Sequence, residues 1–410
     1  MRTNSPAGMV VVVCTAQVLV QLGAYFWPAM LPAMTERWTL TNTQAGWITA
    51  TFYGAYMLAV PVLVTLTDRI PAKYVYLFGA ACTMAGYLFF GLLADGFWSA
   101  LALRALAGIG WAGSYMTGLK LLADRVDAKM MSRAVTGHVA SLGVSGAISY
   151  LLADWLDAWF GWRVAFMLVA LAAMIAWLLV AFLVAVPARS ARHIAAAPAN
   201  ALFDFRPVFQ NRAAMSYAIA YCVHTLEMNV LRGWGVAFLV FVAARTDQSP
   251  NWFSPTAILA AIGLIGTVAS VFGNEAAIRW GRRRLVMAAM AASVTFSAIT
   301  GFLGALSYPL AAALTIFWAI AIWLDSASLT AGTAAAADPA RRGATLAIHS
   351  MLGYAGGFVG PLMVGLMLDL LGGMSPTSWG ASFLMVALLM LLCMFVFRKL
   401  GAQRSDRDSD

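Results

Sequence analysis

The sequence predicts an all-α membrane protein whose twelve transmembrane helices form two pseudo-symmetric six-helix bundles, with both termini in the cytoplasm. Three observations predict this class: an apolar composition, a one-sided distribution of Lys and Arg, and an internal repeat. Of 410 residues, 62% are hydrophobic and only 10% are charged, whereas roughly 25% of residues are charged in soluble proteins. Twelve spans of ~20 residues would use ~240 residues, which leaves no room for a soluble catalytic domain.

The expected spans are apolar segments separated by charged or Gly- and Pro-rich interruptions. In the first half they lie near 8–33, 44–66, 74–94, 97–119, 134–156 and 162–186. In the second half they lie near 213–243, 254–277, 285–306, 309–334, 344–368 and 378–398. The first is too long for the core of a signal peptide, so it is expected to be retained.

The same interruptions predict how the chain divides into domains. The expected parts are an N-terminal six-helix bundle over 1–186, a cytoplasmic linker over 187–212, a C-terminal six-helix bundle over 213–398 and a polar cytoplasmic tail over 399–410.

The positions of Lys and Arg predict the orientation, because cytoplasmic loops carry an excess of these residues. With the N-terminus inside, 21 of the 26 basic residues fall on the cytoplasmic side. Only Arg37, Arg163 and Arg245 fall outside, and Arg104 and Arg232 lie within spans. The net charge of +9 therefore orients helices in a bilayer and does not indicate a nucleic-acid partner.

Two features recur at an offset of 210 residues, which indicates a duplicated six-helix unit. The basic loop that begins at Asp68 is matched by one that begins at Ile278. The Gly-containing stretch 141–146 in the fifth span is matched by 351–356 in the eleventh. Internal repeats of this kind are typical of secondary transporters, whose substrate site lies near the midplane between the repeats.

These loops and the fourth span resemble signatures of the major facilitator superfamily, and the resemblance covers essentially the whole chain. Its cytoplasmic loop signature is matched by Leu66, Asp68, Arg69 and Lys73, and in the second copy by Arg279, Gly281, Arg282 and Arg283. In the family this loop braces one conformation through charge pairs. The resemblance therefore implies a gating role for Asp68, Arg69, Lys73, Arg279, Arg282 and Arg283.

The sequence also departs from the family pattern at informative places. Ile278 replaces the acidic residue of the second loop, and Ala107 stands where the fourth-span signature usually has glutamine. Drug/proton antiporters of the family typically carry a Gly-Pro pair in the fifth span, but 134–156 contains no proline. This departure weighs against drug efflux.

Ionisable groups at bilayer depth cost roughly 2.5–3.5 kcal/mol each on insertion scales, so they are functional candidates by default. The seventh span is richest in them, and one broad face of it carries Tyr217, Tyr221, His224, Glu227, Met228, Leu231 and Arg232. Glu227 is the expected proton carrier and His224 a second carrier or modulator, because burial favours a protonated acid and a nearby cation favours the ionised form. The alternative is a static pair of Glu227 with Arg232 or His224 that only fixes helix packing.

The fourth and first spans carry the expected substrate contacts. Arg104, Gly108, Trp111 and Tyr115 share a stripe, in which a guanidinium beside aromatic rings suits a planar carboxylate. Gln17, Gln21 and Tyr25 share a face of the first span. We assign Arg104, Arg232, Gln17, Gln21, Tyr25, Trp111, Tyr115 and Tyr221 to substrate binding. The alternative for the Arg104 stripe is helix packing, with Arg104 satisfied by helix-end carbonyls or by Glu227.

Asp325, in the tenth span, is the candidate second proton carrier, with a structural ion pair as the equal alternative. His138 and His349 are expected to have structural or gating roles. No metal-ligand spacing, cofactor motif or phosphate-binding loop occurs in the sequence, so transport driven by an ion gradient is expected and direct ATP drive is not.

The sequence thus predicts a non-enzyme: a proton-coupled secondary transporter of a small organic anion, embedded in the lipid bilayer of a bacterial cytoplasmic membrane. It predicts no cofactor and no obligate protein partner. The alternative function is proton-coupled efflux of hydrophobic or cationic compounds. A membrane enzyme or a transporter-like sensor is disfavoured, because no nucleophile–base set and no signalling domain is evident.

Overall fold

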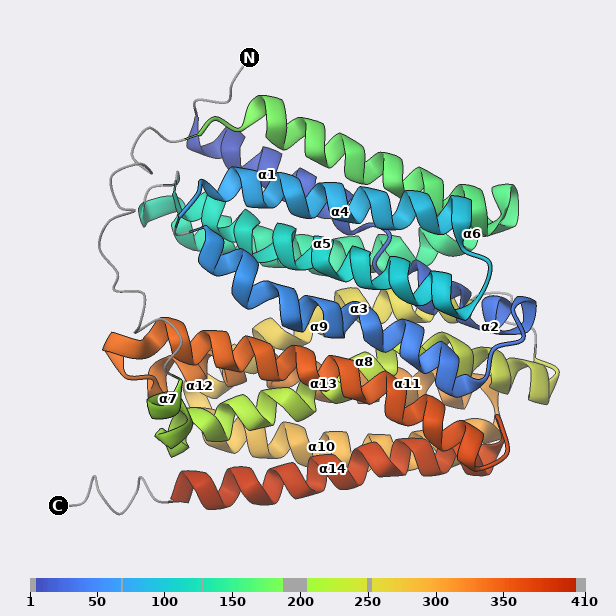
Figure 1. Ribbon diagram of the computed structural model, residues 1–410. Helices are drawn as coiled ribbons and strands as arrows, with labels where there is room; N and C mark the ends of the chain where they lie inside the picture. Colours follow the sequence, from blue (N-terminus) through green and yellow to red (C-terminus); the bar gives the residue numbers. More distant parts are fainter. Residues whose placement is uncertain are drawn as a thin grey trace. The chain divides into compact units, whose positions relative to one another are not determined.

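The computed structural model describes residues 5–67, 69–124, 126, 128–186, 205–248 and 253–402. Asp68, most of the predicted linker (187–204) and most of the predicted tail (403–410) lie outside the described residues. All regular secondary structure in the described part of the chain is helical (Figure 1). In chain order the helices are α1 (Pro6–Gln21), α2 (Phe26–Arg37), α3 (Asn42–Leu66), α4 (Ala72–Leu93), α5 (Phe97–Ala123), α6 (Ala128–Leu183), α7 (Arg206–Gln210), α8 (Arg212–Thr246), α9 (Pro255–Trp280), α10 (Arg282–Leu303), η1 (Gly304–Leu306), α11 (Tyr308–Leu324), α12 (Ser326–Ala336), η2 (Pro339–Arg341), α13 (Arg342–Leu370) and α14 (Pro376–Ala402).

Side chains at the helix starts explain where several of these helices begin. The side chains of Ser5, Asn211 and Ser254 each accept a hydrogen bond from a backbone N–H in the first turn of α1, α8 and α9. Such caps satisfy amides that have no partner within the helix. α1 and α9 also begin with proline, whose fixed φ suits the first helical position.

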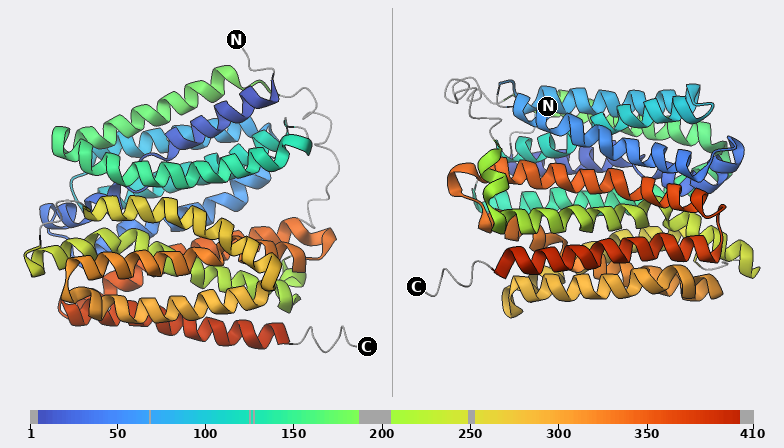
Figure 2. Two further views of the ribbon diagram at one scale, coloured as in Figure 1. Left: turned by 180° about the vertical axis from the view of Figure 1, so that it is seen from behind. Right: turned by 60° about the horizontal axis from the view of Figure 1, so that its bottom comes forward.

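Ten helical segments of the described residues are long and apolar enough to cross a membrane, so the chain is a multi-pass membrane protein. One of the ten, Arg133–Leu183, has 51 residues, and at 1.5 Å per residue this is more than twice the ~30 Å of the hydrocarbon core. Its two legs fold back on each other at Gly161 (Figure 2), where φ is +78°. α5 is not among the ten, although it has 27 residues. The count of twelve spans and the orientation of the termini stay predictions.

Two spans predicted as continuous helices are interrupted. The first is divided into α1 and α2 by a turn over residues 22–25, and the tenth into α11 and α12 at Asp325. Broken helices free backbone groups and occur at membrane depth where these line a cavity or are buried in protein. The predicted spans 8–33 and 309–334 run through both breaks and did not anticipate them.

The contacts between Cα atoms divide the chain into two compact units. Unit 1 comprises Met1–Leu40 and Thr51–Ala196, and unit 2 comprises Thr41–Ala50 and Ala197–Asp410. The first turns of α3 therefore cluster with unit 2 and the remainder of the helix with unit 1. The predicted domain boundaries stay predictions.

Within unit 1, glycines set how closely the helices approach. α4 packs most extensively on α5, and an added Cβ at Gly79 would lie only 2.5 Å from the backbone of Gly113. Leu121, Leu122 and aliphatic residues of α1, α4 and α6 fill the apolar core beside this contact. Small residues let helix backbones pack closely where lipid offers no hydrophobic driving force for association.

In unit 2, glycines likewise allow the backbones of α8 and α13 to pack closely. A side chain at Gly356 would overlap the carbonyl oxygen of Cys222, and one at Gly360 would lie 2.6 Å from that of Leu226. The Thr225 hydroxyl donates to the Gly353 carbonyl at 2.6 Å across this contact. These contacts give the glycines of α13 a packing role. Their effect is to hold the polar face of α8 at a fixed position against α13.

Candidate functional site

Unit 1 contains a buried cation at the break between α1 and α2. Arg104 of α5 is only 1% exposed. One of its nitrogens, Nη1, donates a long hydrogen bond of 3.4 Å to the Ala24 carbonyl, which lies in the break. The guanidinium also lies over the ring of Phe52, 4.3 Å from its centroid. The Ala24 carbonyl is free to accept this bond because the residue four positions on, Pro28, has no backbone N–H.

Arg104 lacks a counter-ion within the described residues. No carboxylate there lies within ion-pair distance of it, and its Nε has no hydrogen-bond partner. The groups in electrostatic range are the tyrosines Tyr87, Tyr53 and Tyr25. A buried charge without a paired opposite charge costs several kcal/mol. The surroundings of Arg104 suit an anionic ligand that would supply the missing charge.

Other buried polar groups of unit 1 are also unsatisfied. In both Gln17 and Gln21 of α1, neither the amide oxygen nor the amide nitrogen has a hydrogen-bond partner among the described residues. The same is true of Trp111 Nε1, whose ring packs on Phe52 at 4.8 Å. Buried polar atoms usually have partners, so unsatisfied ones call for an explanation such as water or a ligand. Arg104 and Trp111, predicted as neighbours on one stripe, do share the Phe52 ring.

The two tyrosines predicted for substrate binding in unit 1 have neighbours of their own. Tyr25 is stacked on Tyr150, with centroids 5.1 Å apart, and its backbone N–H donates to Ser149 Oγ. Tyr115 is stacked on His138, whose Nε2 donates to the Tyr115 carbonyl at 2.9 Å. That bond gives His138 a packing role, in line with its expected structural part.

In unit 2, Glu227 of α8 is fully buried. Its Oε1 accepts a hydrogen bond of 2.6 Å from the indole nitrogen of Trp318 on α11. Ser293 of α10 lies beside the same carboxyl group. Glu227 Oε2 has no hydrogen-bond partner among the described residues. One oxygen is thus held in place while the other stays available for a proton.

His224 lies one turn from Glu227 and contacts the second acid of the unit. Its Nδ1 is 2.9 Å from Asp325 Oδ1, and both side chains are buried. Glu227 lies in electrostatic range of both groups. The structure therefore brings together all three residues predicted for proton coupling. It pairs His224 with Asp325, not with Glu227 as in the static alternative.

A stack of rings continues from His224 along α8 to α13. Tyr221 is stacked between His224, at 5.7 Å, and His349, at 4.0 Å. Both ring nitrogens of His349 have hydroxyl partners, Thr333 Oγ1 at 3.0 Å and Thr330 Oγ1 at 3.2 Å. Tyr221 was predicted to bind substrate, and its faces are covered by these two rings.

Arg232, at the other end of the polar face of α8, lies over the ring of Trp323, 5.0 Å from its centroid. Trp323 lies two residues before Asp325, where the tenth span is interrupted. Opposite that break, α9 approaches so closely that a side chain at Gly273 would overlap the Leu324 carbonyl oxygen. The position of Asp325 therefore depends on the end of α11, which packs against Gly273 of α9.

The predicted gating residues make local contacts. Lys73 Nζ donates to the carbonyls of Ala181 and Val184 at the end of α6, at 2.7 and 2.6 Å. Arg279 pairs with Glu275 one turn earlier on α9, and both are largely exposed. Arg283 donates to the Arg398 carbonyl. Arg69 is exposed, Arg282 is partly buried, and Asp68 lies outside the described residues.

The sequence did not identify three contributors to these clusters. Phe52, Trp318 and Thr333 each contact a predicted residue from a different helix, and no periodic pattern signals such a contact. A weak signal existed for the break at Asp325, because Asp325, Ser326 and Ser328 interrupt an apolar run with residues that favour helix starts. No group of three or more His, Cys, Asp or Glu able to hold a metal ion occurs among the described residues.

Comparisons of sequence and structure find several known proteins that are similar to this chain. Residues 13–269 match the family model of the Major Facilitator Superfamily. Human protein spinster homolog 1 is 24% identical over 415 residues, which cover 95% of this chain and 78% of the relative. A probable 4-methylmuconolactone transporter of Cupriavidus pinatubonensis is 26% identical over 149 residues, covering 33% of each chain.

Solved structures share the fold at low sequence identity. A bacterial homolog of the human lysosomal transporter Spinster, in an inward-facing and occupied conformation, superposes with a TM-score of 0.77 at 13% identity, covering 98% of each chain. A mutant of the nucleoside transporter NupG superposes with a TM-score of 0.76 at 16% identity, covering 95% of this chain and all of the other.

Proposed function

We propose, from the premise that this chain belongs to the Major Facilitator Superfamily, that it moves a small organic anion by alternating access, coupled to a proton gradient. Its multiple apolar helices make it an integral membrane protein, and we place it in a bacterial cytoplasmic membrane. Arg104, Gln17, Gln21 and Trp111 form the anion-recognising part. Glu227, His224 and Asp325 form the proton-carrying part.

The observation that carries the proposal is the uncompensated burial of Arg104. A guanidinium offers two parallel donors to a carboxylate, and Phe52 covers one of its faces. The unsatisfied amides of Gln17 and Gln21 add donors and acceptors in the same unit. Binding an anion would remove the cost of the isolated charge, whereas a cationic drug would increase it. This favours anion transport over the efflux of cations.

Proton coupling is supported by the charge balance in unit 2. Two buried carboxyl groups, Glu227 and Asp325, accompany one imidazole, His224. A single imidazole can pair with only one of the two carboxyl groups, and His224 pairs with Asp325. Glu227 Oε2 keeps an unused acceptor position, which a proton can occupy.

The relatives support transport of a small molecule. The named relatives are transporters or homologues of transporters, and one name specifies a lactone, 4-methylmuconolactone. No enzyme is among these relatives. The substrate class proposed here rests on Arg104 and its surroundings and not on those names.

The test of the proton-carrying role is Glu227→Gln in proteoliposomes. Glutamine keeps the shape and can still accept the Trp318 hydrogen bond, but it cannot release a proton. We expect accumulation driven by an imposed proton gradient to be lost, while exchange of labelled for unlabelled substrate continues. Glu36→Gln, at an exposed acid on α2, serves as the control and should behave as wild type. Gradient-driven accumulation at the wild-type level in Glu227→Gln would contradict the assignment.

A further inference from the structure

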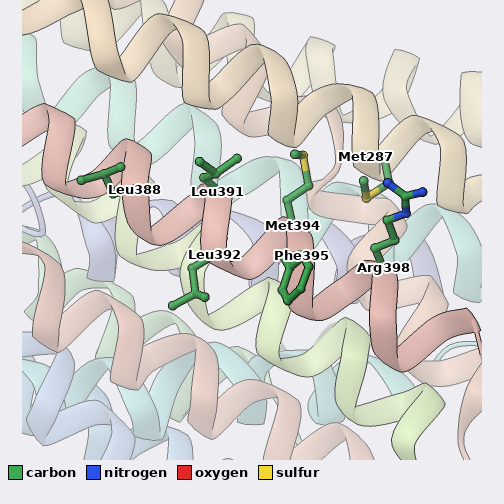
Figure 3. A pocket seen from close by; sticks show the side chains of 7 residues that line it. All are labelled: Met287, Leu388, Leu391, Leu392, Met394, Phe395 and Arg398. Carbon is green, nitrogen blue, oxygen red and sulfur yellow. The ribbon is translucent and has the colours of Figure 1, made fainter.

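A groove runs along the outer side of α14 in unit 2, away from the polar clusters. It has a volume of about 450 Å³ and is lined by Met287 of α10 and, on α14, by Leu388, Leu391, Leu392, Met394, Phe395 and Arg398 (Figure 3). Leu388, Leu392 and Phe395 are each more than half exposed. The lining is therefore apolar along its length and carries one cation at its end.

The backbone of that cation, Arg398, is tethered while its side chain has no protein partner among the described residues. Its backbone carbonyl accepts a hydrogen bond from Arg283 Nη2, which ties the end of α14 to the start of α10. Its guanidinium has no hydrogen-bond or carboxylate partner among the described residues and lies next to Met287 (Figure 3). The guanidinium N–H groups of Arg398 can therefore donate hydrogen bonds to a ligand at this end of the groove.

The charged residues of α10 and α14 at this end of the groove are all basic. The first turn of α10 contributes Arg282, Arg283 and Arg284, and the last turns of α14 contribute Arg398 and Lys399. Neither helix contains an acidic residue. Lys399 Nζ lies over the Phe395 ring, 4.4 Å from its centroid, so this cation stays beside the groove.

We propose that the groove binds one anionic phospholipid of the surrounding bilayer. An acyl chain lies along Leu388, Leu392 and Phe395, and the phosphate group accepts hydrogen bonds from Arg398. Arg284 and Lys399 add long-range attraction. The charge count places this end of unit 2 at the cytoplasmic side, where anionic lipids attract basic clusters and where basic pockets between helices bind lipid headgroups.

An ordinary annular lipid would not account for the combination of features. Apolar contact alone holds zwitterionic and anionic lipids of equal chain length equally well. Arg398, the one basic residue that lines the groove, adds an interaction that only an anionic headgroup makes in full. The other basic residues at the ends of α10 and α14 add attraction of the same sign.

Lipid binding to the purified full-length chain in detergent tests this proposal. Native mass spectrometry would compare phosphatidylglycerol with phosphatidylcholine of identical acyl chains. In the wild type we expect one tightly retained phosphatidylglycerol. Arg398→Gln should weaken its binding about fivefold, the effect expected from one basic residue at a charged membrane surface, and leave phosphatidylcholine unchanged. Leu391→Trp, which fills the groove, should weaken both lipids.

The matched control is Arg342→Gln, which removes an exposed arginine of unit 2 that does not line the groove. It should bind phosphatidylglycerol as the wild type does. Glycerol phosphate without acyl chains should not displace the lipid at equal concentration. Equal retention of both lipids by the wild type, an unchanged affinity in Arg398→Gln, or displacement by glycerol phosphate would each overturn the proposal.

Discussion

Arg104 and Glu227 are both buried ionisable residues, and the difference in their surroundings is why we propose different tasks for them. Glu227 has a fixed donor, Trp318, and a titratable neighbour, His224, so the protein itself can balance its charge. Arg104 has a ring face and one distant carbonyl, which balance little of its charge. A group with internal partners suits proton exchange, whereas one without them suits a ligand that arrives and leaves.

At Arg104 we predict that Arg104→Lys lowers substrate affinity although the charge is kept. Lysine lacks the planar fork, so one charge-assisted hydrogen bond is lost, an effect of about 1.5–3 kcal/mol or roughly 10- to 100-fold in affinity. Isothermal titration of the purified variant with the transported anion measures this. Wild-type affinity in Arg104→Lys would show that the arginine does not bind the substrate through two donors.

The elements that position these residues are interrupted helices. The α1–α2 break presents the Ala24 carbonyl to Arg104, and the α11–α12 break places Asp325 against His224. Both breaks are packed against close neighbours: the Tyr87 ring lies where a side chain at Gly23 would be, and Gly273 lies against Leu324. The geometry of each site therefore depends on residues with no polar group of their own.

For the α11–α12 break we predict that Gly273→Ala separates α9 from α11 and displaces Asp325. The added methyl meets a backbone carbonyl, which cannot move aside as a flexible side chain can, so overpacking should cost about 1–3 kcal/mol. Thermal unfolding in detergent and proton-driven transport would both decline. Gly343→Ala, where an added Cβ meets nothing within 4 Å, should leave both unchanged. Equal stability of the two variants would show that the close approach at Gly273 is unimportant.

The start of α3 depends on one carboxylate. Asp369 of α13 accepts hydrogen bonds from the backbone N–H of Asn42 at 3.0 Å, from the Asn42 side chain at 2.8 Å and from the Thr43 N–H at 2.7 Å. These amides have no partners within the helix, and the negative charge is favourable at a helix N-terminus.

We predict a graded loss of stability at this cap. Asp369→Asn keeps an acceptor but not the charge, and Asp369→Ala removes both, with a cost of about 1–2 kcal/mol typical of a lost helix cap. Thermal unfolding should rank the wild type first, asparagine second and alanine last. An alanine variant as stable as the wild type would exclude a capping role.

At the scale of the whole molecule, the charge distribution is the feature from which we predict the orientation. Basic residues gather at loops on one predicted side, while few charges lie within spans. The proposed lipid groove at α14 ends at one of these basic residues, Arg398. We propose that one set of charges both orients the chain and attracts anionic lipid.

The predicted orientation gives a direct test. A fluorescent protein that matures only in the cytoplasm, fused after residue 410, should fluoresce, and an alkaline phosphatase fused at the same position should be inactive because it requires export. Fusions after Asp247, predicted outside, should give the opposite pattern. Active phosphatase at the C-terminus would refute the charge count as a guide to topology.

The sequence by itself determined the class of protein, because composition and periodicity report directly on the solvent that the helices meet. It also identified most of the polar residues that the structure brings into the two buried clusters, since a charge in an apolar span is conspicuous without any structure. It could not determine their partners. The pairing of His224 with Asp325, the Trp318 bond to Glu227 and the Phe52 ring beneath Arg104 join residues far apart in the chain, and helix packing alone decides such contacts. The breaks at 22–25 and Asp325 lie near local signals, Pro28 without a backbone N–H and the polar run that begins at Asp325. Only the tertiary structure decides that these breaks present the Ala24 carbonyl to Arg104 and Asp325 to His224, because packing brings distant helices together there.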